Sequence, residues 1–220
     1  MILKKILNFG IDKNYFIKKP IKKIEKSCCS LEKEIIDFDN TKEIICKEAN
    51  QQTRKSCDGL CLQGSINFIE FKSLNNFFEK EFQYKLNQEN IEEIEIIEII
   101  KEKVKDFNFK RKITDSLWLL DYILRHQDLS LSNSEIDKYD SIEKNYFVVK
   151  DEIIALVDLT INLNLLSYEG NSLKYRKIMD IEIQNSLNNI INIEVNKPKL
   201  LNCNELEKIL KEENEQTDNI

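Results

Sequence analysis

The chain mixes two kinds of hydrophobic spacing, one typical of helices and one typical of strands. Apolar residues that recur every three or four positions favour helices, whereas short runs that alternate or stay apolar favour strands. Helical spacing covers residues 2–7, 31–49, 73–88, 89–105, 114–124, 151–167 and 204–214. Strand patterns cover residues 56–62, 66–72, 145–150 and 190–195. This order predicts an α/β domain with a central mixed β-sheet flanked by helices.

A short turn joins the first two predicted strands and fixes which of their side chains face each other. Residues 63–65, with a glycine at the centre, separate the strands. A turn of this length pairs Leu62 with Ile66. The same register sets Asp58 opposite Glu70, with both side chains on one face of the hairpin. A turn one residue shorter would move Asp58 to the other face.

Three ionisable side chains are expected at one end of this hairpin. Side chains alternate along a strand, so Glu70 and Lys72 share a face, and Asp58 joins them from the opposing strand. Two carboxylates this close repel each other unless a cation lies between them, and Mg²⁺ binds carboxylate oxygens, backbone carbonyls and water. The carbonyl of Phe71 is a further candidate ligand. A lysine beside such a metal helps to activate water, which favours metal-assisted hydrolysis of a phosphodiester.

The same residues carry a resemblance to a known family. Asp58, then eleven intervening residues, then Glu70-Phe71-Lys72 on a second strand resembles the motif of the PD-(D/E)xK nuclease superfamily, which includes restriction endonucleases. Glu70-Phe71-Lys72 is the only (D/E)xK match in the chain. The resemblance covers residues 40–88 and the later strand–helix–strand order. Cys57 stands where a proline often precedes the aspartate.

The resemblance implies a fold and a set of site residues. The fold would be a restriction-endonuclease-like αβββαβ core, with its last strand at 145–150 and a helix-rich insertion around 89–126. In such a core Asp58 and Glu70 would be metal ligands and Lys72 the water-activating lysine. Glu48 would be the additional helix carboxylate that many members carry.

The charge of the chain limits how it could bind nucleic acid. The formal net charge of −6, from 33 basic and 39 acidic residues, argues against a protein that coats nucleic acid by bulk charge. Local basic groups would then supply phosphate contacts, each weakened by salt. Eight lysines in residues 1–26 form either a basic arm or a solvated first helix. The candidate nucleic-acid-binding residues are Arg54, Lys55, Lys110, Arg111 and Lys112.

Several classes of chemistry are excluded by scarce residue types. His126 is the only histidine, which excludes metal sites built on two histidines and HExxH metalloproteases. With four glycines the chain has no glycine-rich phosphate loop, so nucleotide-driven and nicotinamide chemistry are disfavoured. No uncharged apolar stretch approaches the roughly 18–20 residues that cross a bilayer, and no membrane contact is expected.

The six cysteines, at positions 28, 29, 46, 57, 61 and 203, do not follow the spacing of a disulfide framework. Charged residues interrupt the N-terminus before an apolar signal segment can form. We therefore expect reduced, partly buried thiols in a cytoplasmic protein. A structural zinc site that uses Cys57 and Cys61 stays open as an alternative.

These observations predict a domain organisation and a function. Residues 1–38 would form a basic N-terminal helical arm, 39–214 a single nuclease-like domain and 215–220 an acidic tail. The function would be a Mg²⁺-dependent (or Mn²⁺-dependent) DNA endonuclease in restriction or phage defence, acting as a homodimer or in a larger complex. The alternatives are a non-catalytic interaction subunit that binds a protein through helices in 73–105 and 114–126, and a nuclease that acts on RNA.

Overall fold

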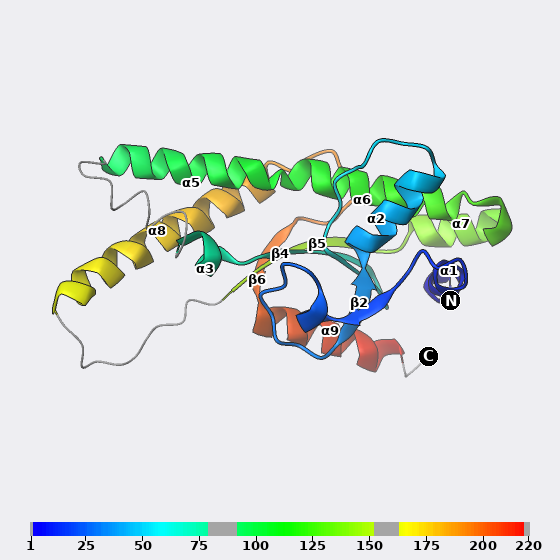
Figure 1. Ribbon diagram of the computed structural model, residues 1–220. Coiled ribbons are helices and arrows are strands. Elements are labelled where there is room, and N and C mark those ends of the chain that lie inside the picture. The colour runs from blue at the N-terminus through cyan, green and yellow to red at the C-terminus, as the bar shows by residue number, and fades with distance from the viewer. Residues whose placement is uncertain (1, 79–91, 152–162, 218–220) are drawn as a thin grey trace.

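The computed structural model describes residues 2–78, 92–151 and 163–217, and its centre is a mixed sheet (Figure 1). In these residues the sheet has six strands in the order β1-β2-β3-β4-β5-β6. Strands β1 to β4 pair with one another antiparallel, whereas β5 pairs parallel with β4 and β6 pairs parallel with β5. The strands are β1 Lys18–Pro20, β2 Glu34–Asp37, β3 Gly59–Leu62, β4 Ile66–Lys72, β5 Lys144–Lys150 and β6 Lys199–Asn202.

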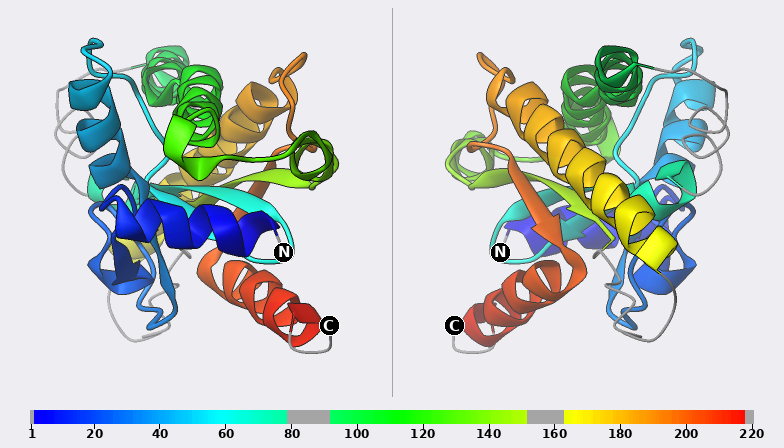
Figure 2. Two further views of the ribbon diagram at one scale, coloured as in Figure 1. Left: turned by 90° about the vertical axis from the view of Figure 1, so that its right-hand side faces the viewer. Right: turned by 90° about the vertical axis from the view of Figure 1, so that its left-hand side faces the viewer.

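Helices cover both faces of the sheet. Figure 2 shows α9 on one side and α5, α6 and α8 on the other. None of the helices in the described part of the chain combines the length and the apolar character that crossing a bilayer requires. The helices are α1 Ile2–Asp12, α2 Phe38–Glu48, α3 Leu74–Asn76, α5 Glu93–Phe107, α6 Phe109–Leu124, α7 Asn133–Asp140, α8 Leu163–Asn188 and α9 Cys203–Thr217.

Alternation along β4 divides the interior into two cores. Phe68 faces the larger core, which α1, α2, α5, α6 and α8 complete. Its neighbours Ile69 and Phe71 face a second core, closed by α9 and the segment before β2. Since β4 is buried on both faces, its polar residues are also enclosed: Glu70 is 0% exposed. A charged group at this position requires compensation from the protein itself.

Helices α5 and α6 follow each other almost without a break. Asn108 ends α5 and precedes α6 with a left-handed backbone, φ 54°. Asparagine tolerates this conformation better than most residues. The two helices lie in the connection between β4 and the parallel strand β5, where a helical crossover is expected. This is the region predicted as a helix-rich insertion around 89–126.

The N-terminal region differs from its prediction. The segment expected as a basic helical arm contains α1 and a short 3-10 helix at Ile21–Lys23, whereas β1 and β2 join the sheet. Residues 34–37 were expected to be helical and instead form β2, in which Ile35 and Ile36 are 2% exposed. Pairing with strands on both sides outweighs the helical spacing of this acidic and basic stretch.

The C-terminal strand also differs. The strand expected at residues 190–195 is wrong, because Asn192 has a left-handed backbone and the strand β6 begins after Pro198. Helix α7 had no counterpart in the predicted elements. Strand β5 and the two hairpin strands are confirmed. Much of the helices predicted over 73–88 and 151–167 lies outside the described residues.

The expectation that the cysteines are reduced is wrong for two of them. Cys29 and Cys203 form a disulfide, with Cα atoms 5.5 Å apart, although the two residues are 174 positions apart in the sequence. Spacing along the chain gave no signal for this bond, since only the fold brings the two residues together. Cys28, Cys46 and Cys57 keep their thiols.

The packing of α1 yields a stability prediction. A Cβ atom at Gly10 would lie 2.1 Å from Cδ2 of the Phe16 ring, which is buried. Gly10→Ala should therefore lower the free energy of unfolding by about 1–3 kcal/mol, despite the gain in helix propensity of roughly 1 kcal/mol. Gly64→Ala is the control, because no atom lies within 4 Å of its added Cβ. Urea denaturation measures both, and equal effects would contradict the packing argument.

Candidate active site

The hairpin brings the predicted carboxylates to one place. Strand β3 pairs with β4 through Leu62–Ile66 and Gly59–Ile69, as the three-residue turn predicted. One step further along this register sets Asp58 against Glu70. The two strands alternate in phase, so both carboxylates lie on the side of the larger core. The geometric basis of the predicted site is thus present.

Lysines surround these two carboxylates. Oε1 of Glu70 accepts hydrogen bonds from Nζ of Lys72 and, at 2.6 Å, from Nζ of Lys112 on α6. Oδ1 of Asp58 lies 3.9 Å from Nζ of Lys26 and 4.0 Å from Nζ of Lys112. The ammonium of Lys112 therefore contacts Glu70 directly and also lies near Asp58. Lys112 was predicted as a phosphate contact, and its position is inside the carboxylate cluster instead.

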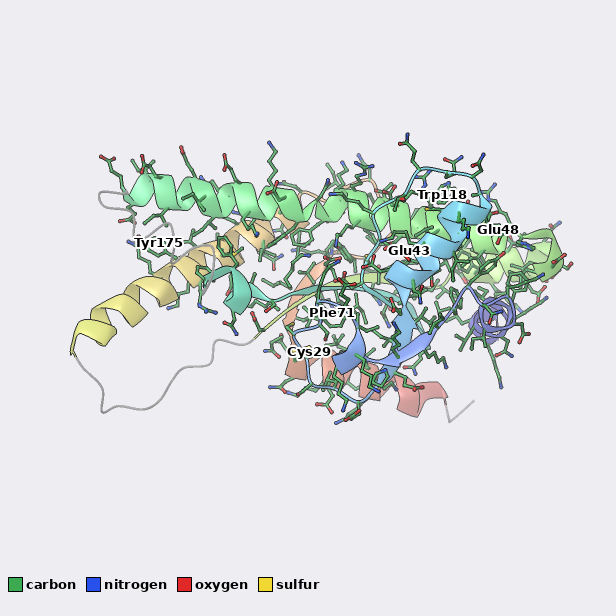
Figure 3. The ribbon with its side chains drawn as sticks, viewed as in Figure 1. Cys29, Glu43, Glu48, Phe71, Trp118 and Tyr175 are labelled. Carbon is green, nitrogen blue, oxygen red and sulfur yellow. A yellow bond between two sulfur atoms is a disulfide. The ribbon has the colours of Figure 1, made fainter. Side chains whose placement is uncertain are left out.

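Asp58 is tied to the backbone of the opposing strand. Its Oδ2 accepts a hydrogen bond of 2.7 Å from the N–H of Phe71. In an extended strand the N–H and C=O of one residue point to the same side, so the Phe71 carbonyl is directed towards Asp58 as well. The side chain of Phe71 packs into the second core on the other face. Figure 3 labels Phe71 at the centre of the molecule, below α2.

The remaining carboxylate oxygens lack hydrogen bonds. Among the described residues, Oδ1 of Asp58 and Oε2 of Glu70 are buried and have no hydrogen-bond partner, and the same holds for the hydroxyl of Tyr146 on β5. Buried polar atoms without partners are costly, and a ligand or ion often satisfies them. Two such oxygens together with a backbone carbonyl form a donor set that fits a hard divalent cation.

The shifted pKa values of Asp58 and Lys112 also indicate that the negative charge of the cluster is only partly compensated. Burial, together with the negative charge of Glu70, raises the pKa of Asp58 to about 7, although Lys112 and Lys72 act in the opposite direction. Burial acts to lower the pKa of Lys112, but Glu70 and Asp58 outweigh it and the pKa is raised. The three lysines thus stabilise the carboxylates only in part, and a bound cation would favour the ionised form of Asp58.

The four residues 54–57 directly precede Asp58, and hydrogen bonds hold this segment against α6. The N–H of Cys57 donates to Oγ of Ser116 at 2.9 Å, and the N–H of Lys55 donates to Asp115 at 3.0 Å. Arg54 also binds Asp115, at 3.1 Å. Because α6 carries Lys112 as well, the same helix positions both the segment 54–57 and the Lys112 ammonium beside the carboxylates.

An open pocket of about 490 Å³ leads to Asp58 from the N-terminal end of α2. Asp37 caps α2 by accepting from the N–H of Asn40, and it also binds Lys19 at 2.6 Å. Asp39, in the first turn, accepts hydrogen bonds of 2.7 Å from Lys42 and from Ser56. The lining residues are Lys19, Lys23, Ile24, Glu25, Asp37, Asp39, Asn40, Glu43 and Asp58.

Of the two glutamates on α2, Glu43 lines the pocket and Glu48 does not. Glu48 accepts hydrogen bonds from the hydroxyls of Tyr15 and Tyr122, and it lies 3.7 Å from Nε2 of His126. Five residues along a helix correspond to a rotation of about 140°, so Glu43 and Glu48 face different ways. Figure 3 shows both on α2, with Glu43 on the side of Phe71. The structure thus does not bring Glu48 to Asp58.

The residues predicted to contact nucleic acid are divided between two roles. Arg54 is stacked over the Trp118 ring at 3.8 Å, and Arg111 lies 3.5 Å from Asp115. Lys55 and Lys110 are exposed and remain available for phosphates. Lys26 and Glu43 were not predicted as site residues. Only the fold brings the segment around Lys26 over Asp58, and no sequence signal indicates it.

Comparison of the chain with protein-family models, with curated proteins and with solved structures gives no match. The carboxylate cluster, its lysines and its pocket are therefore the basis on which a function can be argued.

The raised pKa of Asp58 predicts a pH-dependent stability. Its pKa is 3.8 in the unfolded chain and about 7 in the folded protein, so this group lowers stability progressively as pH rises between the two values. Asp58→Asn removes that cost. Its gain in free energy of unfolding over the wild type should grow through this interval, by at most about 1.4 kcal/mol per pH unit, and then level off. Urea denaturation in EDTA at several pH values measures it.

Asp39→Asn is a control of opposite sign. Burial acts to raise the pKa of Asp39, but hydrogen bonds from Lys42 and Ser56 outweigh it and the pKa is lowered. The ionised carboxylate thus adds stability that is lost as pH falls through its folded-state pKa. Asp39→Asn should be destabilising at neutral pH and less so in acid. A difference that stays constant with pH for Asp58→Asn would contradict the account.

Proposed function

We propose that this protein is a Mg²⁺-dependent or Mn²⁺-dependent endonuclease that hydrolyses phosphodiester bonds in DNA. Asp58 and Glu70 would hold the cation together with the carbonyl of Phe71, and Lys72 would act beside it. Restriction or phage defence is the setting that we propose for such an activity.

One observation carries the proposal: two buried carboxylates converge with a lysine at the end of one hairpin, and each keeps an oxygen that accepts no hydrogen bond from the described part of the chain. Burying a charged group costs considerable free energy. A purely structural role at this position does not require a charged side chain. The lysines reduce that cost but leave Oδ1 of Asp58 and Oε2 of Glu70 without partners among the described residues. Such oxygens are available to ligate a cation.

The topology of the sheet also supports the proposal. Strands β2, β3 and β4 form an antiparallel meander, and β5 returns parallel to β4 after the helices α5, α6 and α7. Three antiparallel strands followed by helices and a further strand are compatible with the βββαβ part of the core that we propose. The helix α2 lies between the first and second strands of the meander, which is a departure from the simple αβββαβ order.

Each residue of the cluster has a distinct role in this proposal. A cation held here would supply Lewis-acid chemistry that polarises the phosphate and makes water nucleophilic. Lys72, hydrogen-bonded to Glu70, would orient the attacking water and balance the charge that develops on the phosphate. The hydrogen bond from Phe71 fixes the Asp58 carboxylate, so that little reorganisation is needed. Lys112, which binds Glu70 and lies near Asp58, would balance the charge of the two carboxylates in the absence of a cation.

The pocket beside Asp58 is the proposed path for the substrate. Lys19 and Lys23 line it, and Lys26 lies next to it with its ammonium 3.5 Å from Asp39. Lysines at such a mouth attract phosphates, and their contribution falls as salt rises. The acidic residues of the pocket would repel a polyanion without a bound cation. Substrate binding should therefore depend on the metal.

A second candidate function is a non-catalytic interaction subunit with a nuclease-like fold. Lys72 and Lys112 both bind Oε1 of Glu70, and Glu70 itself is 0% exposed. A charge cluster that the protein neutralises by itself serves folding specificity without any metal. The two candidates differ in whether a divalent cation competes with Lys112.

Nuclease activity is the direct test. Asp58→Asn, Glu70→Gln and Lys72→Ala should each lower the rate of cleavage of supercoiled plasmid DNA by about 100-fold or more, because each removes a group from the reacting centre. Cleavage should require Mg²⁺ or Mn²⁺ and stop with EDTA. Gel electrophoresis of plasmid, single-stranded DNA and RNA substrates measures the rates and separates the DNA proposal from an RNA nuclease.

Matched controls are available on the same scaffold. Glu48→Gln changes a carboxylate that binds Tyr15 and Tyr122, and Lys110→Ala changes an exposed lysine of α6. Both should keep cleavage within a few-fold of the wild type. If the wild type cuts none of the substrates, or if Lys72→Ala cuts as fast as the wild type, the proposed activity is wrong.

Competition between Lys112 and the cation gives a separate test. Lys112→Met leaves a buried carboxylate with one ammonium fewer, so in EDTA the free energy of unfolding should fall by about 3 kcal/mol. Mg²⁺ or Mn²⁺ should then raise the melting temperature of Lys112→Met more than that of the wild type, because a bound cation replaces the lost charge. Lys110→Met is the control. A melting temperature of Lys112→Met that ignores both cations would favour the non-catalytic candidate.

A further inference from the structure

Three cysteines meet at the carboxyl ends of the parallel strands. The sulfur atoms of Cys28, Cys29 and Cys203 all lie within 4.8 Å of one another. Cys203 is the first residue of α9, directly after β6, and the Cys28 thiol donates to the carbonyl of Val149 on β5 at 3.6 Å. Figure 3 shows Cys29 close to α9. Two segments from opposite ends of the chain thus place their sulfurs together.

We propose that Cys28, Cys29 and Cys203 form a thiolate site that, once the disulfide is reduced, binds one thiophilic divalent cation such as Zn²⁺. The site is separate from the carboxylate cluster, because thiolates select soft and borderline metals whereas carboxylates select Mg²⁺. It does not depend on the proposed nuclease function.

The chemistry of loading this site is balanced as follows. A phosphine and one water molecule convert the Cys29–Cys203 disulfide into two thiols, and the phosphine becomes its oxide. The cation then displaces one proton from each of the three thiols, so three protons are released per cation bound. A water molecule would complete the fourth position of a tetrahedral centre.

The geometry suits a cation of this size. Zinc–sulfur bonds of about 2.3 Å in a tetrahedron place sulfur atoms roughly 3.8 Å apart. The observed limit of 4.8 Å means that side-chain rotations suffice to reach this arrangement. The N-terminus of α9 favours negative charge at Cys203, and the backbone N–H of Lys72 lies within hydrogen-bond reach of the Cys28 sulfur. Both contacts stabilise thiolates.

Cys28 supplies the third sulfur of this site. It lies beside the disulfide and keeps its thiol. Its sulfur lies within 4.8 Å of the sulfurs of both Cys29 and Cys203, so all three can contact one cation once the disulfide is reduced. A metal ion binds a thiol by displacing its proton, so the affinity of the site should rise with pH.

Cobalt(II) is the probe for this site. After reduction with a phosphine, and with all six thiols counted by a colorimetric reagent, Co²⁺ should bind with a stoichiometry of one. The expected spectrum has thiolate-to-cobalt charge-transfer absorption in the near ultraviolet and intense bands of tetrahedral cobalt in the red. Zn²⁺ should bleach these bands. The oxidised protein should show none of them.

Variants separate this site from others. Cys28→Ala should abolish the charge-transfer band or weaken Co²⁺ binding at least tenfold, whereas Cys46→Ala, also a thiol outside the disulfide, should keep it. Asp58→Asn should keep it too, whatever becomes of the nuclease proposal. A fully reduced protein without the band, or a band that persists in Cys28→Ala, overturns the assignment.

A stability measurement guards against a loss of fold on reduction. If the reduced protein keeps its circular dichroism spectrum, Zn²⁺ should raise its urea midpoint and leave that of reduced Cys28→Ala unchanged. If reduction unfolds the chain, Zn²⁺ should restore the spectrum. A reduced protein that Zn²⁺ neither stabilises nor refolds contradicts the proposal.

Discussion

The hydrogen bond between Asp58 and the N–H of Phe71 is the contact on which the candidate site depends. It extends the pairing of β3 with β4 by one step beyond the ladder and holds a carboxylate against the opposing strand. A slip of one residue in this pairing would turn Asp58 to the other face of the sheet. The turn at residues 63–65 excludes that slip, so a local feature of the chain determines the face of the sheet on which Asp58 lies.

The burial of so many charges shapes the balance between stability and chemistry. Glu70 and Asp58 are 0% and 1% exposed, and the lysines around them come from three separate elements. Lys26 lies in the loop before β2, Lys72 on β4 and Lys112 on α6. Each lysine recovers part of the desolvation cost, and two oxygens still have no hydrogen bond within residues 2–78, 92–151 and 163–217. A site that was optimised for stability alone would have replaced these groups by apolar side chains.

The sequence was sufficient for the local features of this structure and insufficient for its long-range ones. The alternation in residues 66–72 and the length of the turn predicted the hairpin and its register, because both are set within a few residues. Strand β2 was predicted as helix, since Ile35 and Ile36 become strand only through neighbours on both sides. Lys112 was recognised as basic, but its place beside Glu70 depends on how α6 crosses the sheet. The disulfide from Cys29 to Cys203 also depends on the overall fold, so local sequence patterns do not predict it.

The edges of the sheet determine how copies of this chain can associate. Strand β1 forms one edge with Lys18, Lys19 and Pro20. Proline lacks an N–H to donate, and charged lysines resist the approach of another strand. The opposite edge, β6, is four residues long and begins just after Pro198. Continuous sheets across two molecules are thus disfavoured, so self-association through helical surfaces is favoured over pairing of sheet edges.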